Sequence, residues 1–213
     1  MSVVWTSVTA MLANVYVDGF NLYYGIKRWP DSKWLDLGAL CARLFPNDRI
    51  NRIRYFTAHL KGQADESAPR RQQVYLRALA IDPRLSIHTG TFLVRRQWMP
   101  LAMPARRLVP VIRTEEKGSD VSLGAYLLFD ACQGDYDMAV VKTNDSDLRE
   151  PIAMVQGPPF ELPVWVVNPH PRKAAALRPT THLDLHRGDV IACQLPQTVR
   201  AANGKILTKP GGW

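Results

Sequence analysis

The chain has 213 residues, the length of one ample domain or of one domain with a tail. Hydrophobic residues make up 46% and charged residues 22%, which is typical of a globular protein and excludes a largely disordered chain. The net charge of +8 favours polyanionic partners, chiefly nucleic acid. Three distant cysteines exclude a disulfide scaffold and a structural zinc site and suit a reducing cytoplasm, and no apolar run is long enough for a membrane span.

The first half of the chain begins with an apolar segment that is typical of a buried strand. Residues 1–12 are expected to form an N-terminal extension, and Met11 could equally be the biological start. The run 13–17 then predicts a core strand that ends in a turn at Asp18 and Gly19. Short helices are expected over 21–28 and 35–44, followed by a β-branched and aromatic strand over 50–60.

The middle of the chain combines strong helical spacing with one irregular segment. Residues 68–81 have helical spacing, and 85–94 predict a third strand. Residues 95–113 contain three prolines and are expected to form a long loop or a protruding hairpin. The next segment, 119–132, predicts a helix with Val121, Ala125, Leu128 and Cys132 on one face.

The last elements complete an alternation of strands and helices. A buried strand is expected over 137–143, a helix over 147–155 and a fifth strand over 163–167. This alternation predicts an α/β fold, a three-layer sandwich in which helices flank a central, mostly parallel, five-stranded sheet. Residues 13–168 are therefore assigned to one domain, and the Pro-rich residues 169–213 to an extension that packs on it.

Acidic residues stand where functional groups of a parallel sheet usually lie, beyond the carboxyl ends of the strands. Asp18 follows the first strand, Asp145 follows the fourth, and Asp120 stands at the head of the long helix between them. A few carboxylates at one rim are typical ligands of Mg²⁺ or Mn²⁺. In a basic protein this gathering predicts metal-assisted cleavage of a phosphodiester bond.

Each acid also has a plainer interpretation. Asp18 before Gly19 fits an ordinary turn, and Asp120 could simply stabilise a helix N-terminus. Asp147 with Glu150 three residues later fits a capping box. The prediction therefore depends on the joint placement of the acids and not on any one of them.

Two segments resemble a known family. The segment VYVDGFNLYYGIK, residues 15–27, resembles the opening motif of the NYN domain, a branch of the PIN-like nuclease superfamily. The segment EKGSDVSLGAYLLFDACQGDYDMAVVKTNDSDL, residues 116–148, is similar to the second and third motifs of that family. The spacing agrees too, and the likeness extends over about residues 13–196. It implies a PIN-like twisted parallel sheet with the first and fourth strands adjacent, and a ribonuclease dependent on Mg²⁺ or Mn²⁺.

The resemblance also implies roles for individual residues. It makes Asp18, Asp120 and Asp145 metal ligands, with Asp147 as a fourth, and it makes Asn21 the residue that orients Asp18 or a metal-bound water. Lys117 could pair with a phosphate or with the acids, and Thr143 and Asn144 shape the rim. One departure from the family pattern is Lys142, which adds a cation directly before Thr143.

Basic and aromatic residues suggest where an RNA would lie. No acidic residue occurs from 83 to 114, and the segment interleaves arginines with aromatic rings, a pattern that suits phosphate contacts and base stacking. A solvated loop with Trp98 packed on the body is the alternative. Tyr23, Tyr24 and Trp29 could stack on a base, although two of the three are expected in the core. The expected nucleic-acid contacts of this segment are Arg95, Arg96, Trp98, Arg106 and Arg107.

The sequence thus predicts a cytoplasmic, metal-dependent ribonuclease, a hydrolase that acts on RNA, preferably single-stranded. The mechanism expected is attack on the phosphate by a water that the carboxylate-bound Mg²⁺ or Mn²⁺ activates. Two alternatives are an inactive RNA-binding module and a toxin-like regulatory partner, and an oxidoreductase on the same fold is a remote third. Dimerisation is a further expectation, because PIN-like relatives often form homodimers, and no membrane partner is expected.

Overall fold

The computed structural model describes residues 10–61, 65–102, 107–177, 181–201 and 203–213. A seven-stranded sheet forms the middle layer, in the order β4-β3-β2-β1-β5-β6-β7. All neighbouring pairs are parallel except β3 and β4, so the predicted mostly parallel α/β sheet is confirmed. The strands are β1 (Leu12–Asp18), β2 (Arg49–Ala58), β3 (Leu85–Pro100), β4 (Leu108–Lys117), β5 (Met138–Lys142), β6 (Val164–Asn168) and β7 (Thr181–Asp184).

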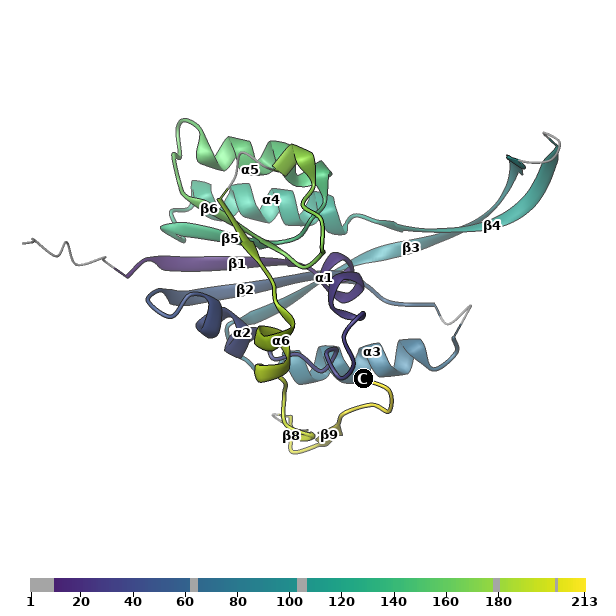
Figure 1. The fold of residues 1–213 in the computed structure, drawn as a ribbon, viewed down its shortest axis with the longest axis horizontal. Helices are drawn as coiled ribbons and strands as arrows, with labels where there is room; N and C mark the ends of the chain where they lie inside the picture. Colours follow the sequence, from purple (N-terminus) through teal and green to yellow (C-terminus); the bar gives the residue numbers. More distant parts are fainter. Residues whose placement is uncertain (1–9, 62–64, 103–106, 178–180, 202) are drawn as a thin grey trace, which may run out of the picture.

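Helices cover both faces of this sheet (Figure 1). On one face, α4 (Ser119–Cys132) and α5 (Arg149–Gln156) enclose a core that includes Leu123, Leu127 and Val141. The other face is covered by α1 (Gly19–Ile26), α2 (Leu37–Leu44), α3 (Ala68–Leu79) and α6 (Arg187–Ala192). A small antiparallel pair, β8 (Thr198–Arg200) and β9 (Ile206–Thr208), lies below these helices, and two 3₁₀ turns, η1 (Ser146–Leu148) and η2 (Ala175–Leu177), complete the described elements.

The predicted count of five strands is wrong, because two strands that are short or exposed lack the hydrophobic run from which strands were predicted. β4 contains Pro110 and alternates apolar with charged residues, and as an edge strand it tolerates the proline. β7 has only four residues, of which Leu183 is the one large aliphatic residue, and it lies at the opposite edge. Hydrophobic runs identify central strands far better than such edge strands.

The segment predicted as a loop or hairpin is a hairpin of two long strands. β3 continues past Val94 to Pro100 and pairs with β4, in register from Thr91 with Lys117 to Pro100 with Leu108. We call residues 91–117 the arm, of which 103–106 lie outside the described residues. It extends far beyond the body of the molecule (Figure 1).

The buried face of α4 also differs from the prediction. Val121 is 77% exposed, whereas Leu123, Leu127 and Ala131 are buried. Asp130 is buried on this face as well, because it is paired with Arg54 of β2. A buried carboxylate is rare without such a partner, which the sequence pattern does not reveal.

Among the described helices, none is long and apolar enough to cross a membrane.

Candidate functional site

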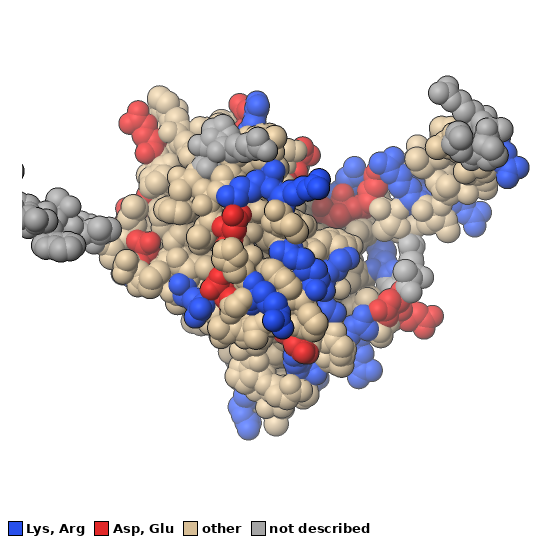
Figure 2. Space-filling view, viewed as in Figure 1, with Lys and Arg blue, Asp and Glu red and all other residues tan. Residues whose placement is uncertain are grey.

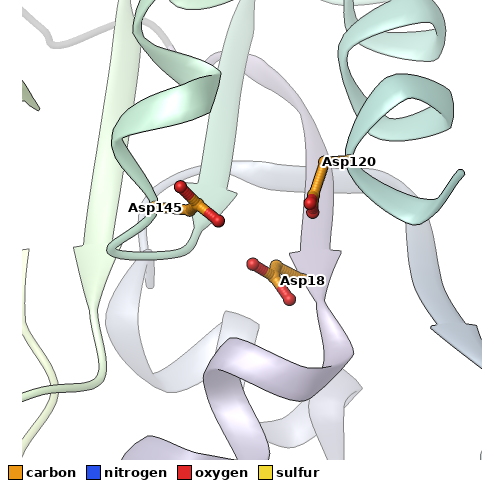
Figure 3. Close-up of side chains that lie close together, drawn as sticks. All are labelled: Asp18, Asp120 and Asp145. Atoms are coloured by element: carbon orange, nitrogen blue, oxygen red, sulfur yellow. The ribbon is translucent and has the colours of Figure 1, made fainter. Parts of the chain in front are cut away.

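Three acidic side chains meet at the carboxyl ends of β1 and β5 (Figure 3). Asp18 is the last residue of β1, Asp145 follows β5, and Asp120 lies in the first turn of α4. One carboxylate oxygen of each lies within 4.8 Å of those of the other two. We call these three residues the acid cluster. β1 and β5 are neighbours, so the sheet itself brings two of the three acids together.

Hydrogen bonds hold the two strand ends in one arrangement. Asp18 accepts from the backbone N–H of Asn21 at 2.9 Å and from the Thr143 hydroxyl at 3.0 Å. The same Thr143 oxygen accepts from the backbone N–H of Asp145 at 3.0 Å. The Asn21 side chain accepts from the backbone N–H of Asn144 at 2.9 Å, so Asn21 connects the two loops. These contacts preorganise the acid cluster before any ligand arrives.

Glycine is required directly after Asp18. A Cβ atom on Gly19 would lie 2.7 Å from the Phe56 carbonyl oxygen and 2.8 Å from the Tyr55 hydroxyl. Only a residue without a side chain lets β2 approach the start of α1 so closely. The turn that places Asp18 therefore depends on Gly19.

The electrostatics of the acid cluster favour a cation. Burial raises the pKa of Asp18 to about 6, and the charges of Asp120 and Asp145 act in the same direction. Burial also raises the pKa of Asp120, with added repulsion from Asp145 and Glu116. Carboxylates this close to one another repel when all of them are ionised. Oxygen ligands at this spacing fit a hard divalent ion such as Mg²⁺ or Mn²⁺.

Three other predicted residues, Asp147, Lys117 and Lys142, are not members of the acid cluster, although the charge of Asp147 also raises the pKa of Asp120. Asp147 is exposed, and its backbone N–H donates to Asp145 while its carboxylate is outside the cluster. Lys117 lies 3.3 Å from Glu115, with which it pairs. Lys142 is fully buried, so it adds no cation at the rim.

A cleft of about 750 Å³ opens in front of the acid cluster. Phe20 and Phe92 meet edge to face across it with ring centroids 5.6 Å apart. The sequence motifs did not single out Phe20, Glu116 or His170 as site residues, whereas Phe92 was expected only as an aromatic residue of the basic segment. Phe20 lies inside the first motif, but no spacing connects His170 with the acids. The cleft is lined by the acid cluster together with Phe20, Asn21, Tyr24, Leu60, Lys61, Asp65, Ala68, Phe92, Thr114, Glu116 and His170.

Two tyrosines near the cleft are more exposed than expected. Tyr23 is 36% and Tyr24 is 55% exposed, so the expectation that two of the three aromatic residues after the first motif lie in the core is wrong. Their rings contact each other edge to face at 5.5 Å. Tyr24 lines the cleft directly.

Residues at the base of the arm line the cleft, whereas the described arginines of the arm do not. Phe92, Thr114 and Glu116 line the cleft, whereas none of the described residues Arg95, Arg96, Trp98 and Arg107 does. Trp98 is 65% exposed and does not pack on the body. Arg106 lies outside the described residues. Figure 2 shows acidic side chains gathered where the arm leaves the body and basic side chains farther out.

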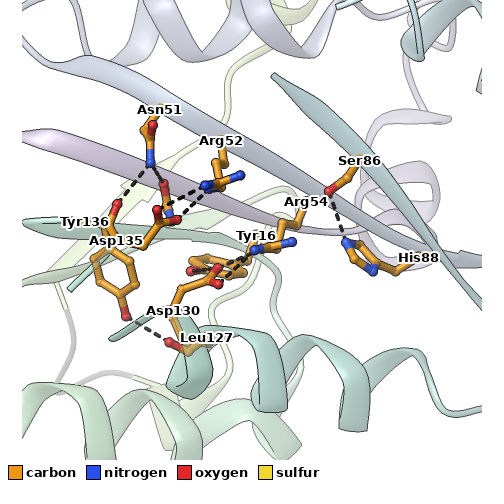
Figure 4. A network of polar contacts seen from close by, with 11 residues as sticks. Tyr16, Asn51, Arg52, Arg54, Ser86, His88, Leu127, Asp130, Asp135 and Tyr136 are labelled. Carbon is orange, nitrogen blue, oxygen red and sulfur yellow. Dashed lines mark hydrogen bonds and ion pairs between the residues drawn. The ribbon is translucent and has the colours of Figure 1, made fainter. Parts of the chain in front are cut away.

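A second polar cluster anchors α4 to the sheet (Figure 4). Arg54 donates two hydrogen bonds to Asp130, at 2.7 and 2.8 Å, and the Tyr16 hydroxyl donates a third at 2.8 Å. Burial and the Asp130 charge raise the pKa of Tyr16, which keeps its proton in place to donate. Nearby, Arg52 pairs with Asp135 at 2.6 Å. The contacts of Asp130 with Arg54 and Tyr16 hold α4, the helix that carries Asp120, against the sheet.

Comparison with known proteins gives one similar sequence and one similar structure. No family model matches the sequence. The chain is 27% identical to the 6-hydroxy-3-succinoylpyridine 3-monooxygenase HspA of Pseudomonas putida (strain DSM 28022 / S16), over 93% of this chain and 74% of that protein. It also resembles the crystal structure of VPA0982, a protein of unknown function from Vibrio parahaemolyticus RIMD 2210633. The TM-score is 0.55 at 14% identity, covering 85% of this chain and 97% of the other. This second likeness concerns the fold alone.

The similarity to HspA corrects the predicted function. A relative that matches most of the chain is named as a monooxygenase, so the prediction of a metal-dependent ribonuclease, and with it the assignment to the hydrolases, is wrong. The physical reason is that an acid cluster at the strand ends of an α/β sheet places charge and oxygen ligands but does not determine the reaction. Among the functions weighed from the sequence, the remote one, an oxidoreductase, is the one that this similarity supports.

Proposed function

We propose that the protein is an oxidoreductase of the monooxygenase type that adds one oxygen atom to a small aromatic compound in the cleft. The observation that carries this proposal is the 27% identity to HspA along 93% of the chain. The name of that relative describes oxygenation of a substituted hydroxypyridine at ring position 3. Similarity over nearly the whole chain includes the segments that form the cleft.

The cleft has the size and composition for such a substrate. Its volume of about 750 Å³ lies within the roughly 300–1,000 Å³ typical of small-molecule sites. Phe20, Tyr24 and Phe92 supply aromatic faces beside the polar acid cluster. Aromatic rings prefer edge-to-face or offset contacts with other rings, so these side chains suit a flat substrate better than a flexible one.

We include a divalent cation, Mg²⁺ or Mn²⁺, in this proposal, with Asp18, Asp120 and Asp145 as its ligands. The raised pKa of Asp18, which burial and its acidic neighbours cause, supports a site built for a positive charge. When bound, the cation would supply a charge that holds an anionic oxygen of the substrate. The adjacency of β1 and β5, with an acid after each, also supports the proposal that the fold is PIN-like.

Oxygenation of this kind needs dioxygen and electrons. Where one oxygen atom enters the ring in place of hydrogen, the second leaves as water and the reaction takes up two electrons and two protons. Where the oxygen atom displaces an acyl group, as at position 3 of the test substrate, that group leaves as an aldehyde, the second oxygen atom leaves as water, and the reaction takes up four electrons and four protons. The donor class we propose is a reduced nicotinamide or flavin supplied in solution. The test substrate is 6-hydroxy-3-succinoylpyridine, the compound in the name of the relative.

The experiment follows isotopically labelled dioxygen into the product by mass spectrometry, with Mn²⁺ and each donor. We expect one labelled atom per product with the unmodified protein. The Asp18→Asn variant should lose the label, whereas Asp147→Asn, whose carboxylate lies outside the acid cluster, should keep it. Label that enters equally in the Asp18→Asn variant would refute the acid cluster as the site. No label with any donor would refute an oxygenase of this substrate.

A further inference from the structure

A second cavity borders the cleft, between α1 and α3. It has a volume of about 270 Å³, and Phe20, Tyr24, Leu60, Asp65 and Ala68 line both spaces. We call this second cavity the aromatic pocket. Its aromatic lining residues are Phe20, Tyr23, Tyr24, Tyr55, Tyr75 and Trp213.

The inner wall of the aromatic pocket consists of aromatic rings that pack on one another. The rings of Tyr75 and Trp213 lie 5.2 Å apart between centroids, and Trp34 packs behind both at 5.9 and 6.5 Å. The Tyr75 hydroxyl donates to the Leu35 carbonyl oxygen at 2.9 Å, so its polar group is satisfied. Trp213 is only 8% exposed. These rings present aromatic faces that are held in place before any ligand binds.

One polar group of the aromatic pocket lacks a partner. Tyr55 is 94% buried, its relative exposure being 6%, and within the described part of the chain no residue hydrogen-bonds to its hydroxyl. The hydroxyl lies beside the first residue of α1, since a Cβ atom on Gly19 would be 2.8 Å away. Gly19 directly follows Asp18. The hydroxyl oxygen is still open to the aromatic pocket, so a ligand that accepts its hydrogen bond would take the place of water there.

The cations of the aromatic pocket are already engaged. Lys33 donates to the Gly212 carbonyl oxygen at 2.8 Å, and Arg71 pairs with Asp65 and Ser67. The pocket therefore suits a neutral ring and has no free charge for an anionic group. A volume of 270 Å³ lies just below the roughly 300–1,000 Å³ range of ligand sites, and it has room for one aromatic ring because a cavity of about 150 Å³ already holds benzene.

We propose that the aromatic pocket binds a single neutral six-membered aromatic ring, with a ring nitrogen or oxygen substituent accepting a hydrogen bond from Tyr55. This assignment rests on the proposed function and deepens it: the substrate class is a monocyclic hydroxylated aromatic or heteroaromatic compound. Its ring enters the aromatic pocket, and the substituent that is not enclosed points to the acid cluster through the shared wall at Phe20 and Tyr24.

The test measures binding alone, with 2-hydroxypyridine as the probe and the full chain. Calorimetry gives Kd, and tryptophan fluorescence reports the pocket through Trp213. We expect Tyr55→Phe to weaken binding about two- to tenfold, the effect of one lost hydrogen bond. Ala68→Phe should fill the space and weaken binding by at least roughly tenfold. The Trp213→Phe variant should lose the fluorescence change, which assigns that signal to the aromatic pocket.

The matched control is Ala80→Phe, an equal enlargement at an exposed residue just past α3. It should bind the probe as the unmodified protein does. Retained stabilisation of Ala68→Phe by Mn²⁺ would show that this variant is folded with its acid cluster intact. Unchanged binding in both Tyr55→Phe and Ala68→Phe, or no binding of the probe to the unmodified protein, would overturn the proposal.

The binding and labelling experiments together distinguish failure of the proposed function from failure of the aromatic pocket as a ring site. Binding that depends on Tyr55 and Ala68, without incorporation of labelled oxygen, would support the aromatic pocket as a ring site and refute the oxygenase. Incorporation that is unaffected by Ala68→Phe would support the oxygenase and overturn the aromatic pocket as the site of the ring.

Discussion

At the scale of single residues, Lys142 is a costly side chain in the core. It is fully buried at the end of β5, and in the described part of the structure its ammonium group has no well-formed hydrogen bond, although it interacts with the Cys41 thiol. Burial raises the pKa of the neighbouring Cys41 thiol, an effect that the Lys142 charge opposes. A buried cation without a paired anion costs several kcal/mol in desolvation, by rough estimate.

Replacing this lysine should therefore stabilise the protein. The Lys142→Met variant keeps the length of the side chain and removes its charge, and we expect a gain of about 1–3 kcal/mol in the free energy of unfolding. The urea midpoint at neutral pH measures this gain. Lys205→Met, at an exposed position, is the control and should not shift the midpoint. A lower midpoint for Lys142→Met would mean that the charge is satisfied in solution.

Asp145 and Asp147 form a natural pair for testing the metal site. They are two positions apart, yet only Asp145 belongs to the acid cluster. At a concentration of about 100 times Kd a bound ion adds roughly 2.7 kcal/mol, which corresponds to an increase in Tm of roughly 5–10 °C for a chain of this length. We expect Mn²⁺ to give such an increase in the unmodified protein and in Asp147→Asn but not in Asp145→Asn. Equal increases in both variants would contradict the assigned ligands, and so would a complete absence of metal stabilisation.

At the scale of the elements, the outer part of the arm contributes little to the stability of the folded body. Near the arm base, Lys61 donates a hydrogen bond to the Phe92 carbonyl oxygen at 2.9 Å. Beyond the base, Trp98, Leu108 and Ile112 are all more than 60% exposed. A two-stranded ribbon of this kind adds little stability in water.

Shortening the arm should therefore leave the fold intact. Replacing residues 97–111 with Asn-Gly joins Arg96 to Ile112, which are already paired, through a two-residue hairpin turn. We expect Tm to change by less than about 3 °C, equivalent to under 1 kcal/mol, and the stabilisation by Mn²⁺ to persist. Differential scanning calorimetry measures both. A large loss of Tm would show that the outer arm contributes to the folded body.

The elements also show which parts of the fold could be predicted from the sequence. The central strands β1, β5 and β6 are apolar because helices cover them on both sides, so their hydrophobic runs identified them. β2 carries three arginines, and its β-branched and aromatic residues identified it instead. The edge strands β4 and β7 bury few side chains, so their sequences contain no hydrophobic run of this kind. The acid cluster was predictable because parallel strands end at one rim. The aromatic pocket was not, because its wall joins residues as distant as Tyr55 and Trp213, whose proximity no local pattern encodes.

At the scale of the whole molecule, carboxylates in ion pairs connect stability with pH. Hydrogen bonds from Arg52 and Asn14 outweigh the effect of burial and lower the pKa of Asp135, and Lys173 likewise lowers that of Asp184. Groups with a lowered pKa stabilise the folded state above their ordinary value, near 4, and lose that contribution as the pH falls through the folded value. Asp18 and Asp120, with raised pKa values, act in the opposite direction but are fewer in number than the lowered carboxylates, which also include Asp65, Asp82 and Glu115.

We therefore expect the metal-free protein to lose stability between about pH 5 and pH 3, as paired carboxylates take up protons. Urea midpoints measured across this range, without divalent ions, give the slope. The Asp135→Asn variant should have a shallower slope, with a difference below about 1 kcal/mol because its partner Arg52 is largely exposed. An identical slope in the variant would show that this pair does not contribute.

The position of β1 in the middle of the sheet has a consequence for the order of folding. Its two neighbours are β2, which follows closely in the chain, and β5, which comes much later. Thr143, which bonds to Asp18, lies 125 positions beyond it. During synthesis, β1, β2 and β3 can pair before β5 has been made. The edge of β1 that later pairs with β5 then stays exposed to solvent. Pairing of β5 with β1 and assembly of the acid cluster are thus the same late event, so a growing chain forms its functional site only after the residues of β5 and Asp145 have been made.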